Sequence, residues 1–326
     1  MKHTIISAVI IIMVLAPFCS HGQEGEEAKP KPGFHWSVML GGGWVSGRAS
    51  NEEVGEDNER IESYGQKGKS YSSPVPVFSG GMSYVFGQTG TTVFIGNSSA
   101  SLGADTAALS AGVSQDTGGY GNLAAVVSYG STEVWKDPYL LGADREKTDE
   151  KNLSAAVSWD DLLDTPLSVR YALCRTRVDE DEIGAREPDL RRDGMIHDLG
   201  MGFALPLCET FVVTTNLSFT KGVMDGKSAG YDGYGGDLGC MLNMNSVTLT
   251  LTGGYGSRRY DRAHPVFHKV RQEREGTVSG MVIYPKPFEY EKATLYLLVS
   301  HNRKEANIRF FEGNASLTGV GIGYEF

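Results

Sequence analysis

The sequence predicts an all-β fold, a transmembrane antiparallel up-and-down β-barrel of about fourteen strands, with twelve as the smaller possibility. Three observations predict it. The chain begins like an exported protein, polar and apolar residues then alternate with a period of two, and short and long connections alternate between the expected strands. Bacterial outer-membrane barrels have an even number of strands, short periplasmic turns and longer external loops. Both chain termini are therefore expected on the periplasmic side.

The first residues have the order of a secretory signal peptide. Lys2 gives a positive start, an apolar stretch runs from Ile5 to Phe18, and small and polar residues follow. The stretch is shorter than the roughly 20 residues that span a bilayer as a helix. We therefore expect a signal peptide over residues 1–22 and no retained anchor. Lipid attachment at Cys19 is disfavoured because the bulky Phe18 precedes it.

The mature chain divides into a short leader and one long domain. Residues 23–33 are charged, contain prolines and are too short to fold, so we expect a flexible periplasmic leader. Residues 34–326 are expected to form the barrel. The negative mean hydropathy of the chain does not exclude a membrane, because lipid-facing and lumen-facing residues of a barrel alternate and cancel. The net charge of −10 argues against nucleic acid as a partner, since phosphate backbones require clustered positive charge.

The strand signal begins at Phe34. Phe34, Trp36, Val38 and Leu40 alternate with smaller or more polar residues, which places an apolar face on one side of an extended strand. No helical periodicity competes over a comparable length. Comparable alternation recurs over residues 78–86, 153–159, 169–173, 199–205, 211–219, 247–251, 295–299 and 320–326.

The expected connections alternate in length. A soluble β-sandwich would explain the strand pattern but not this regular alternation of short turns and long loops. The alternation predicts that Asp57 and Glu182 lie outside the cell and that Glu26 and Asp161 face the periplasm. Short turns are expected at 87–90, 116–119, 160–166, 206–209, 243–246 and 284–292, and long loops near 47–74, 98–105, 132–150, 178–194, 223–233, 258–273 and 303–314.

The last strand carries a sorting pattern. Gly321, Tyr324 and the terminal Phe326 have the spacing of the C-terminal signal that barrel-assembly machinery reads in outer-membrane proteins. The expected partners are this machinery, outer-membrane lipids and lipopolysaccharide, and the sequence predicts no particular oligomeric state.

Catalysis is not expected. Ser300 and His301 are neighbours, but adjacent residues of a strand point to opposite faces and cannot act as a nucleophile and its base. His264 and His268 would share a face only on a helix, which Pro265 disfavours, so no metal or cofactor is expected. The cysteines left after the signal peptide, Cys174, Cys208 and Cys240, are odd in number and widely spaced, which fits neither a disulfide framework nor a zinc site.

Two acidic segments, residues 52–62 and 179–187, read first as solvated external loops. Binding of a divalent cation, or attraction of cationic solutes toward a pore, is the alternative for both.

The favoured function is a passive channel or substrate-selective porin of unknown solute. About fourteen strands enclose more space than eight, whose inward side chains nearly fill the interior. The alternative is a non-transporting surface protein whose external loops bind a partner. The candidate pore-lining residues are Arg170, Asn216, Thr250 and Lys292.

Several motifs are familiar as a group: Glu133–Tyr139, Ala143–Asp149, Leu190–Gly194, Tyr231–Gly236, Leu251–Tyr255, and Tyr260–Asp261 followed by Pro265–Phe267. Through them the chain resembles a family of uncharacterised proteobacterial outer-membrane proteins, defined as a domain of unknown function. The resemblance covers nearly all of the mature chain and implies a barrel without a known activity. Loop anchoring explains these motifs as well as ligand contact does. The external-loop candidates are Trp135, Asp137, Tyr139, Arg145, Arg191, Arg192, Tyr260 and Asp261.

Overall fold

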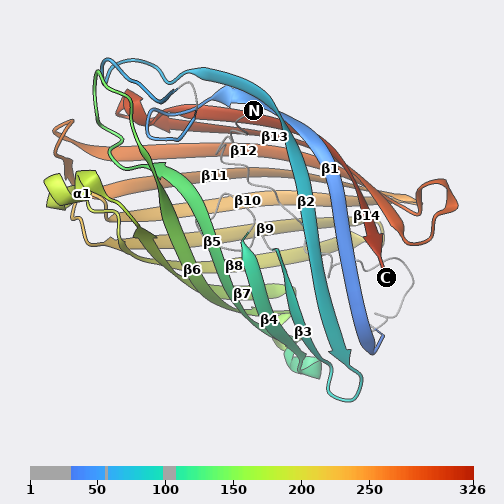
Figure 1. The fold of residues 1–326 in the computed structure, drawn as a ribbon. Coiled ribbons are helices and arrows are strands. Elements are labelled where there is room, and N and C mark those ends of the chain that lie inside the picture. Colours follow the sequence, from blue (N-terminus) through green and yellow to red (C-terminus); the bar gives the residue numbers. More distant parts are fainter. Residues whose placement is uncertain (1–30, 56–57, 98–107) are drawn as a thin grey trace.

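The structure, a computed structural model, describes residues 31–55, 58–97 and 108–326. In these residues fourteen antiparallel strands pair in chain order, and β1 pairs with β14 to close the barrel (Figure 1). The predicted fold is thus confirmed. The strands are β1 (Gly33–Arg48), β2 (Ser70–Phe86), β3 (Thr91–Asn97), β4 (Leu109–Asp116), β5 (Asn122–Trp135), β6 (Lys147–Asp160), β7 (Leu167–Val178), β8 (Gly194–Cys208), β9 (Phe211–Met224), β10 (Tyr231–Met244), β11 (Val247–His264), β12 (Lys269–Pro285), β13 (Ala293–Ala306) and β14 (Gly313–Glu325).

The helices lie in the connections and are short. None of them, within the described ranges, is long and apolar enough to cross a bilayer. They are α1 (Glu182–Arg186) and the 3-10 turns η3 (Gly118–Tyr120), η4 (Leu162–Asp164), η5 (Pro188–Leu190), η6 (Pro287–Glu289) and η7 (Arg309–Phe311).

The outer surface of the barrel is apolar because the side chains alternate between two faces. Phe78, Leu217 and Leu238 expose 62, 63 and 62% of their area on this surface. A soluble protein rarely leaves so many large apolar side chains in water. When lipid surrounds these side chains, they are no longer exposed to water. The closed sheet also pairs its backbone N–H and C=O groups with one another, as every membrane-spanning segment must. The barrel therefore crosses a membrane.

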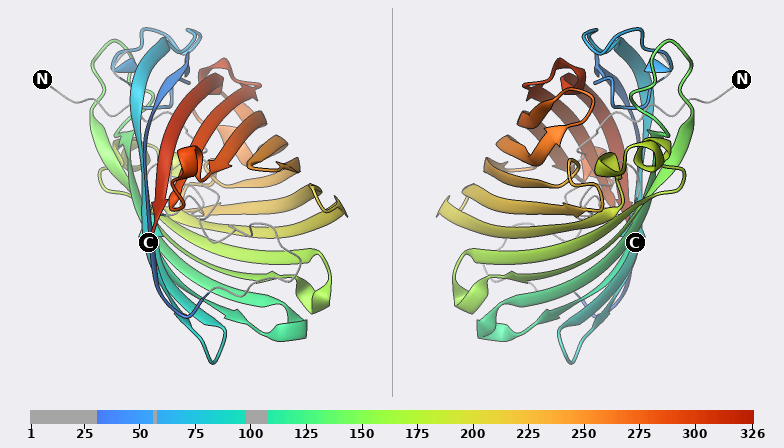
Figure 2. Two further views of the ribbon diagram at one scale, coloured as in Figure 1. Left: turned by 90° about the vertical axis from the view of Figure 1, so that its right-hand side faces the viewer. Right: turned by 90° about the vertical axis from the view of Figure 1, so that its left-hand side faces the viewer.

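The two ends of the barrel differ, as the alternation of connections predicted. At one end, called the turn end, short turns such as Asn245-Ser246 join the strands, and Asn245 adopts a left-handed φ of +49° that such tight turns require. The opposite end, called the loop end, carries α1 and the longer connections (Figure 2). The first residue of β1, Gly33, and the last residue of β14, Glu325, both lie at the turn end.

One predicted loop is wrong. Residues 258–273 form the ends of β11 and β12, joined by a turn of residues 265–268, with an irregularity in pairing between Arg259 and Ala263. Tyr260 and Asp261 are thus strand residues and not loop residues. The segment resembles a loop in sequence because it is rich in charged residues. Its inward charges are nevertheless paired within the barrel, as in the ion pair of Arg271 with Glu273.

Labelling tests the topology. Glu182 lies in α1 at the loop end and Asp161 precedes η4 at the turn end, while Asp57 and Glu26 lie outside the described residues. In a background with Cys174, Cys208 and Cys240 replaced by serine, a membrane-impermeant maleimide should label Glu182→Cys on intact cells and leave Asp161→Cys unlabelled. Labelling of Asp161→Cys alone would reverse the orientation.

Candidate functional site: the lumen and its lid

Loops from around the whole ring meet over the loop end. Residues from the connections β1–β2, β5–β6, β7–β8, β11–β12 and β13–β14 share one hydrophobic cluster. These connections are spread around the barrel, so a contact shared by all of them must lie across the mouth. We call residues 49–55, 58–69, 136–146, 179–193, 265–268 and 307–312 the lid. The buried members of the cluster are Ile61, Tyr139, Ile183, Leu190, Ile308, Phe310 and Phe311.

Aromatic contacts give the lid a packed interior. The rings of Phe310 and Phe311 are fully buried and lie 5.1 Å apart, and Phe267 lies 5.3 Å from Phe310. Tyr139 adds a ring 5.3 Å from Phe310, and its hydroxyl shares a 2.9 Å hydrogen bond with Nε2 of His264. Edge-to-face and tilted pairs of this kind stabilise beyond the area that they bury. The lid is therefore a folded structure.

Two glutamates anchor the lid to the inner wall of the barrel. Arg271, on the inward face of β12, donates to both carboxylate oxygens of Glu52 at 3.0 and 2.7 Å. The same guanidinium contacts Glu273 at 2.6 Å, and Lys304 of β13 pairs with Glu53 at 2.9 Å. Arg271 and Glu273 are almost fully buried, with 8 and 5% of their side chains exposed. Removing one member of such a group would leave a buried charge without its partner.

The contact with Arg271 lowers the pKa of Glu52. Burial alone would raise the pKa of Glu52, but the charge and hydrogen bonds of Arg271 outweigh it and hold the pKa at about 2. Glu52 is therefore ionised at neutral pH and keeps the lid attached to β12.

Acid should loosen the lid. The pKa of Glu52 is lower in the closed lid than its ordinary value of 4.5, so its stabilisation is complete above pH 4.5 and is lost as the pH falls toward about 2. We expect ion current through the barrel in a planar bilayer to rise over this interval. Glu52→Gln should carry the higher current at neutral pH and lose this pH step. A wild-type current that stays flat from pH 4.5 to 2 would contradict the role of Glu52.

Arg145 joins two parts of the lid. Its guanidinium donates to the carbonyl oxygens of Asn51 at 2.6 Å, of Pro138 at 2.9 Å, and of Asn58. It also lies 4.4 Å from the ring of Trp135, whose indole N–H donates to the Glu53 carbonyl at 3.0 Å. Burial lowers the pKa of Arg145 to about 10, which still leaves it charged at neutral pH. It satisfies backbone carbonyls that would otherwise be buried without donors.

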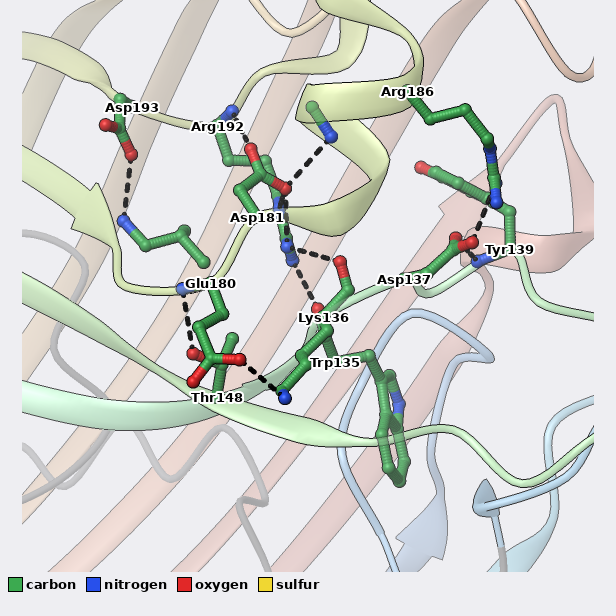
Figure 3. Close-up of polar contacts among 12 residues, drawn as sticks. Trp135, Lys136, Asp137, Tyr139, Thr148, Glu180, Asp181, Arg186, Arg192 and Asp193 are labelled. Carbon is green, nitrogen blue, oxygen red and sulfur yellow. Dashed lines mark hydrogen bonds and ion pairs between the residues drawn. The ribbon is translucent and has the colours of Figure 1, made fainter.

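A second set of ion pairs joins residues 136–146 to residues 179–193 (Figure 3). Lys136 pairs with Glu180 at 2.6 Å. Arg192, which Asp181 holds at 2.7 Å within the second segment, donates to the Lys136 carbonyl at 3.1 Å. Arg186 pairs with Asp137 at 2.7 Å. The predicted loop residues Trp135, Asp137, Tyr139, Arg145 and Arg192 thus come together in the lid, with Trp135 as the last residue of β5.

One wall of the lumen is polar. Asn216 of β9 faces inward between Gly202 and Asp237, and its amide donates to Asp237 at 2.9 Å. Its side chain is nevertheless exposed, which means that there is open space beside it within the barrel. Arg170 of β7 lies on the same face, with its Cβ 3.9 Å from the position that a Cβ of Gly200 would take.

The opposite wall is apolar. Val45 and Leu317 are buried on the inward faces of β1 and β14 and pack with Tyr71, Val75 and Leu298. Beneath them lies a small cavity of about 90 Å³. Thr250, on the inward face of β11, borders this wall opposite Met281. The cavity is lined in part by Met39, Val77, Met281, Tyr296 and the glycines of β14.

Lys292 lies elsewhere, and Arg191 lies in the lid but is exposed. Lys292 does not face the lumen, because it ends the turn before β13 and its ammonium lies 5.5 Å from the ring of Phe326, which stacks on the outward Trp36. The carbonyl of Arg191 accepts from Gly226 N–H at 3.1 Å.

The reading of the acidic segment 52–62 as a solvated loop is wrong at Glu52 and Glu53, which pair with basic residues of the wall. Their partners, Arg271 and Lys304, were not among the predicted site residues. Their inward positions on strands could have marked them as candidates. Their acidic partners could not be identified in this way, because each pair joins residues more than 200 positions apart in the sequence.

Comparison with solved structures gives outer-membrane proteins of low similarity. A FadL homologue of Pseudomonas aeruginosa is 9% identical, with 90% of this chain and 89% of that chain covered and a TM-score of 0.40. The anion-selective porin from Comamonas acidovorans is 10% identical over 91 and 100% of the chains, with a TM-score of 0.43. The outer-membrane channel DcaP of Acinetobacter baumannii is 11% identical over 89 and 97%, with a TM-score of 0.42.

No curated protein matches the chain. A family model described as "Protein of unknown function (DUF2860)" matches residues 33–325, which is the whole barrel. Together with the closed barrel and its apolar outer surface, the match confirms the predicted membership of an uncharacterised outer-membrane family. The protein is an outer-membrane β-barrel that belongs to the DUF2860 family.

Proposed function

We propose that this protein is a passive, solute-selective channel whose mouth is closed by the lid. The observation that carries the proposal is the combination of a water-accessible polar wall at Asn216 and Asp237 with a packed cover attached to β12 and β13. An unobstructed general pore would not need such a cover. A lid bound by a few ion pairs and one cluster restricts passage and can open without unfolding the barrel.

The same proposal includes the partners expected for such a protein. Lipopolysaccharide surrounds its loop end in the outer leaflet, and barrel-assembly machinery inserts it through the C-terminal strand.

Liposome swelling tests the channel. Purified, heat-modifiable protein is reconstituted with neutral, anionic and cationic solutes of increasing size. A size cut-off that rises in a lid-loosened variant such as Glu52→Gln supports selective passage through the lumen. Absence of swelling with every solute, in both proteins, would exclude the channel and leave the surface-binding alternative.

Arg170 is expected to influence ion selectivity. Its charge lies inside the barrel, where screening by salt is weaker than at the mouth. Arg170→Glu should shift the reversal potential in a salt gradient toward cation selectivity without loss of folded protein. Arg177→Glu is the matched control, because it makes the same charge change on the outward face of β7. Equal shifts in the two variants would exclude a specific role for Arg170.

A further inference from the structure

A hollow lies on the outside of the barrel, at the loop ends of β10 to β14 and β1. Its volume is about 1180 Å³. Most of its lining comes from outward positions, as the strand pairing shows: Arg259 pairs across to Gln272, and Arg274 lies between Ser257 and Glu305. Four further lining residues, Arg258, Tyr260, Glu273 and Lys304, stand at inward positions of the same strands. The outward side chains form the membrane-facing part of the hollow.

The lining is basic although the protein is acidic. At its outward and loop positions six lysine and arginine residues line it against four aspartates and glutamates, while the whole chain carries a net charge of −10. Two of the acids are already matched, since Glu305 pairs with Arg303 at 2.8 Å and Asp232 pairs with Lys221 at 2.7 Å. Within the described ranges, Arg259 and Arg274 are exposed and have no ion-pair partner. Their guanidinium groups are available to an anion.

The height of the hollow identifies its surroundings. Tyr234 and Tyr255 lie at its lower edge and are 64 and 59% exposed on the outward face. Exposed tyrosines mark the boundary between hydrocarbon and headgroups. Farther along β10 toward the turn end, the outward positions are Gly236 and then Leu238. Leu238 already belongs to the apolar outer surface that faces the hydrocarbon. The arginines therefore lie at the level of lipid headgroups, and the loop segments containing Lys67 and Arg309 form the upper edge.

We propose that this hollow binds the phosphorylated sugar headgroup of a membrane glycolipid, the chemistry of lipopolysaccharide. Planar guanidinium groups bind phosphate in two-point hydrogen bonds, and several of them converge here. A volume of about 1180 Å³ exceeds that of a site for one phosphate and suits a phosphorylated oligosaccharide. Tyr255 and the open outward position at Gly276, where a Cβ would meet no atom within 4 Å, leave room for acyl chains below the headgroup.

Native mass spectrometry of barrel purified from outer membranes in mild detergent tests the site. Wild-type protein should retain glycolipid, and after delipidation it should rebind phosphorylated lipid A. Arg259→Gln/Arg274→Gln should bind it at least about tenfold more weakly, because each lost charged hydrogen bond is worth roughly a factor of ten. Arg175→Gln/Arg177→Gln makes the same charge change on the outward face of β7 and should bind like wild type. The single variants Arg259→Gln and Arg274→Gln serve if the double variant does not fold.

Three competitors distinguish the sources of phosphate. Dephosphorylated lipid A should bind poorly, and neither inorganic phosphate nor phosphatidylglycerol should displace the glycolipid at equal concentration. Equal binding by Arg259→Gln/Arg274→Gln and by Arg175→Gln/Arg177→Gln would overturn the site. Displacement by phosphatidylglycerol would overturn the glycolipid assignment in favour of a general anionic-lipid surface, and displacement by inorganic phosphate alone would reduce it to a simple anion site.

Discussion

Arg271→Ala is expected to open the lid. The substitution leaves Glu273 buried without its partner and releases Glu52 from β12. Breaking a buried ion pair on one side costs about 3 kcal/mol or more, which shifts the closed-to-open ratio of the lid about a hundredfold. The barrel itself should remain folded, since its strands keep their backbone pairing. Open probability in a planar bilayer and uptake of large antibiotics by cells should both rise.

Arg177→Ala is the matched control for this experiment. It removes the same kind of side chain from the outward face of β7, away from the lid and from the proposed glycolipid site. Hydrogen exchange of residues 58–69 gives an independent readout, because these amides should lose protection only in Arg271→Ala. Unchanged exchange and unchanged current in Arg271→Ala would show that the Glu52 contact does not hold the lid.

Deleting Phe326 is expected to lower the amount of folded barrel severely. The residue has two roles at the turn end: it is the last residue of the predicted assembly signal, and it closes the junction between β14 and β1. Its N–H donates to the Trp36 carbonyl at 2.9 Å, and the two rings stack with centroids 3.5 Å apart. We expect export to continue and heat-modifiable protein in the outer membrane to fall several-fold.

Trp36→Ala separates the two roles. It removes the stacking partner but leaves the C-terminal residues intact. If recognition by the assembly machinery dominates, Trp36→Ala should be mild and Phe326 deletion severe. Equal losses would assign the effect to closure of the junction, and normal folded protein after Phe326 deletion would exclude both roles.

The sequence predicted the barrel well because period two is a local property. Phe34, Trp36 and Leu40 reveal their outward face from neighbouring residues alone, and one choice of face fixes the register of a strand. The same reasoning correctly separated Ser300 from His301, which lie on opposite faces of β13. Strand ends were less predictable, because the charges near Tyr260 resemble those of a solvated loop.

The lid could be predicted only in part. Trp135, Tyr139 and Arg145 stand out in a short motif, and the structure brings them together. Glu52 and Arg271 are separated by 219 residues, and nothing local distinguishes their pairing from the other charges of the chain. Lys292 shows the opposite failure: a strand-start position suggested the lumen, but the turn directs its ammonium toward the ring of Phe326.

Single-channel recording in a planar bilayer tests the central claim most directly. Purified, correctly folded wild-type protein should give discrete current steps that are brief and infrequent at pH 7, and Arg271→Ala should give the same unit steps with much longer openings. This is the behaviour of a polar lumen behind a lid. If neither protein passes current while both run as heat-modifiable barrels, the lumen does not conduct and the channel account is wrong.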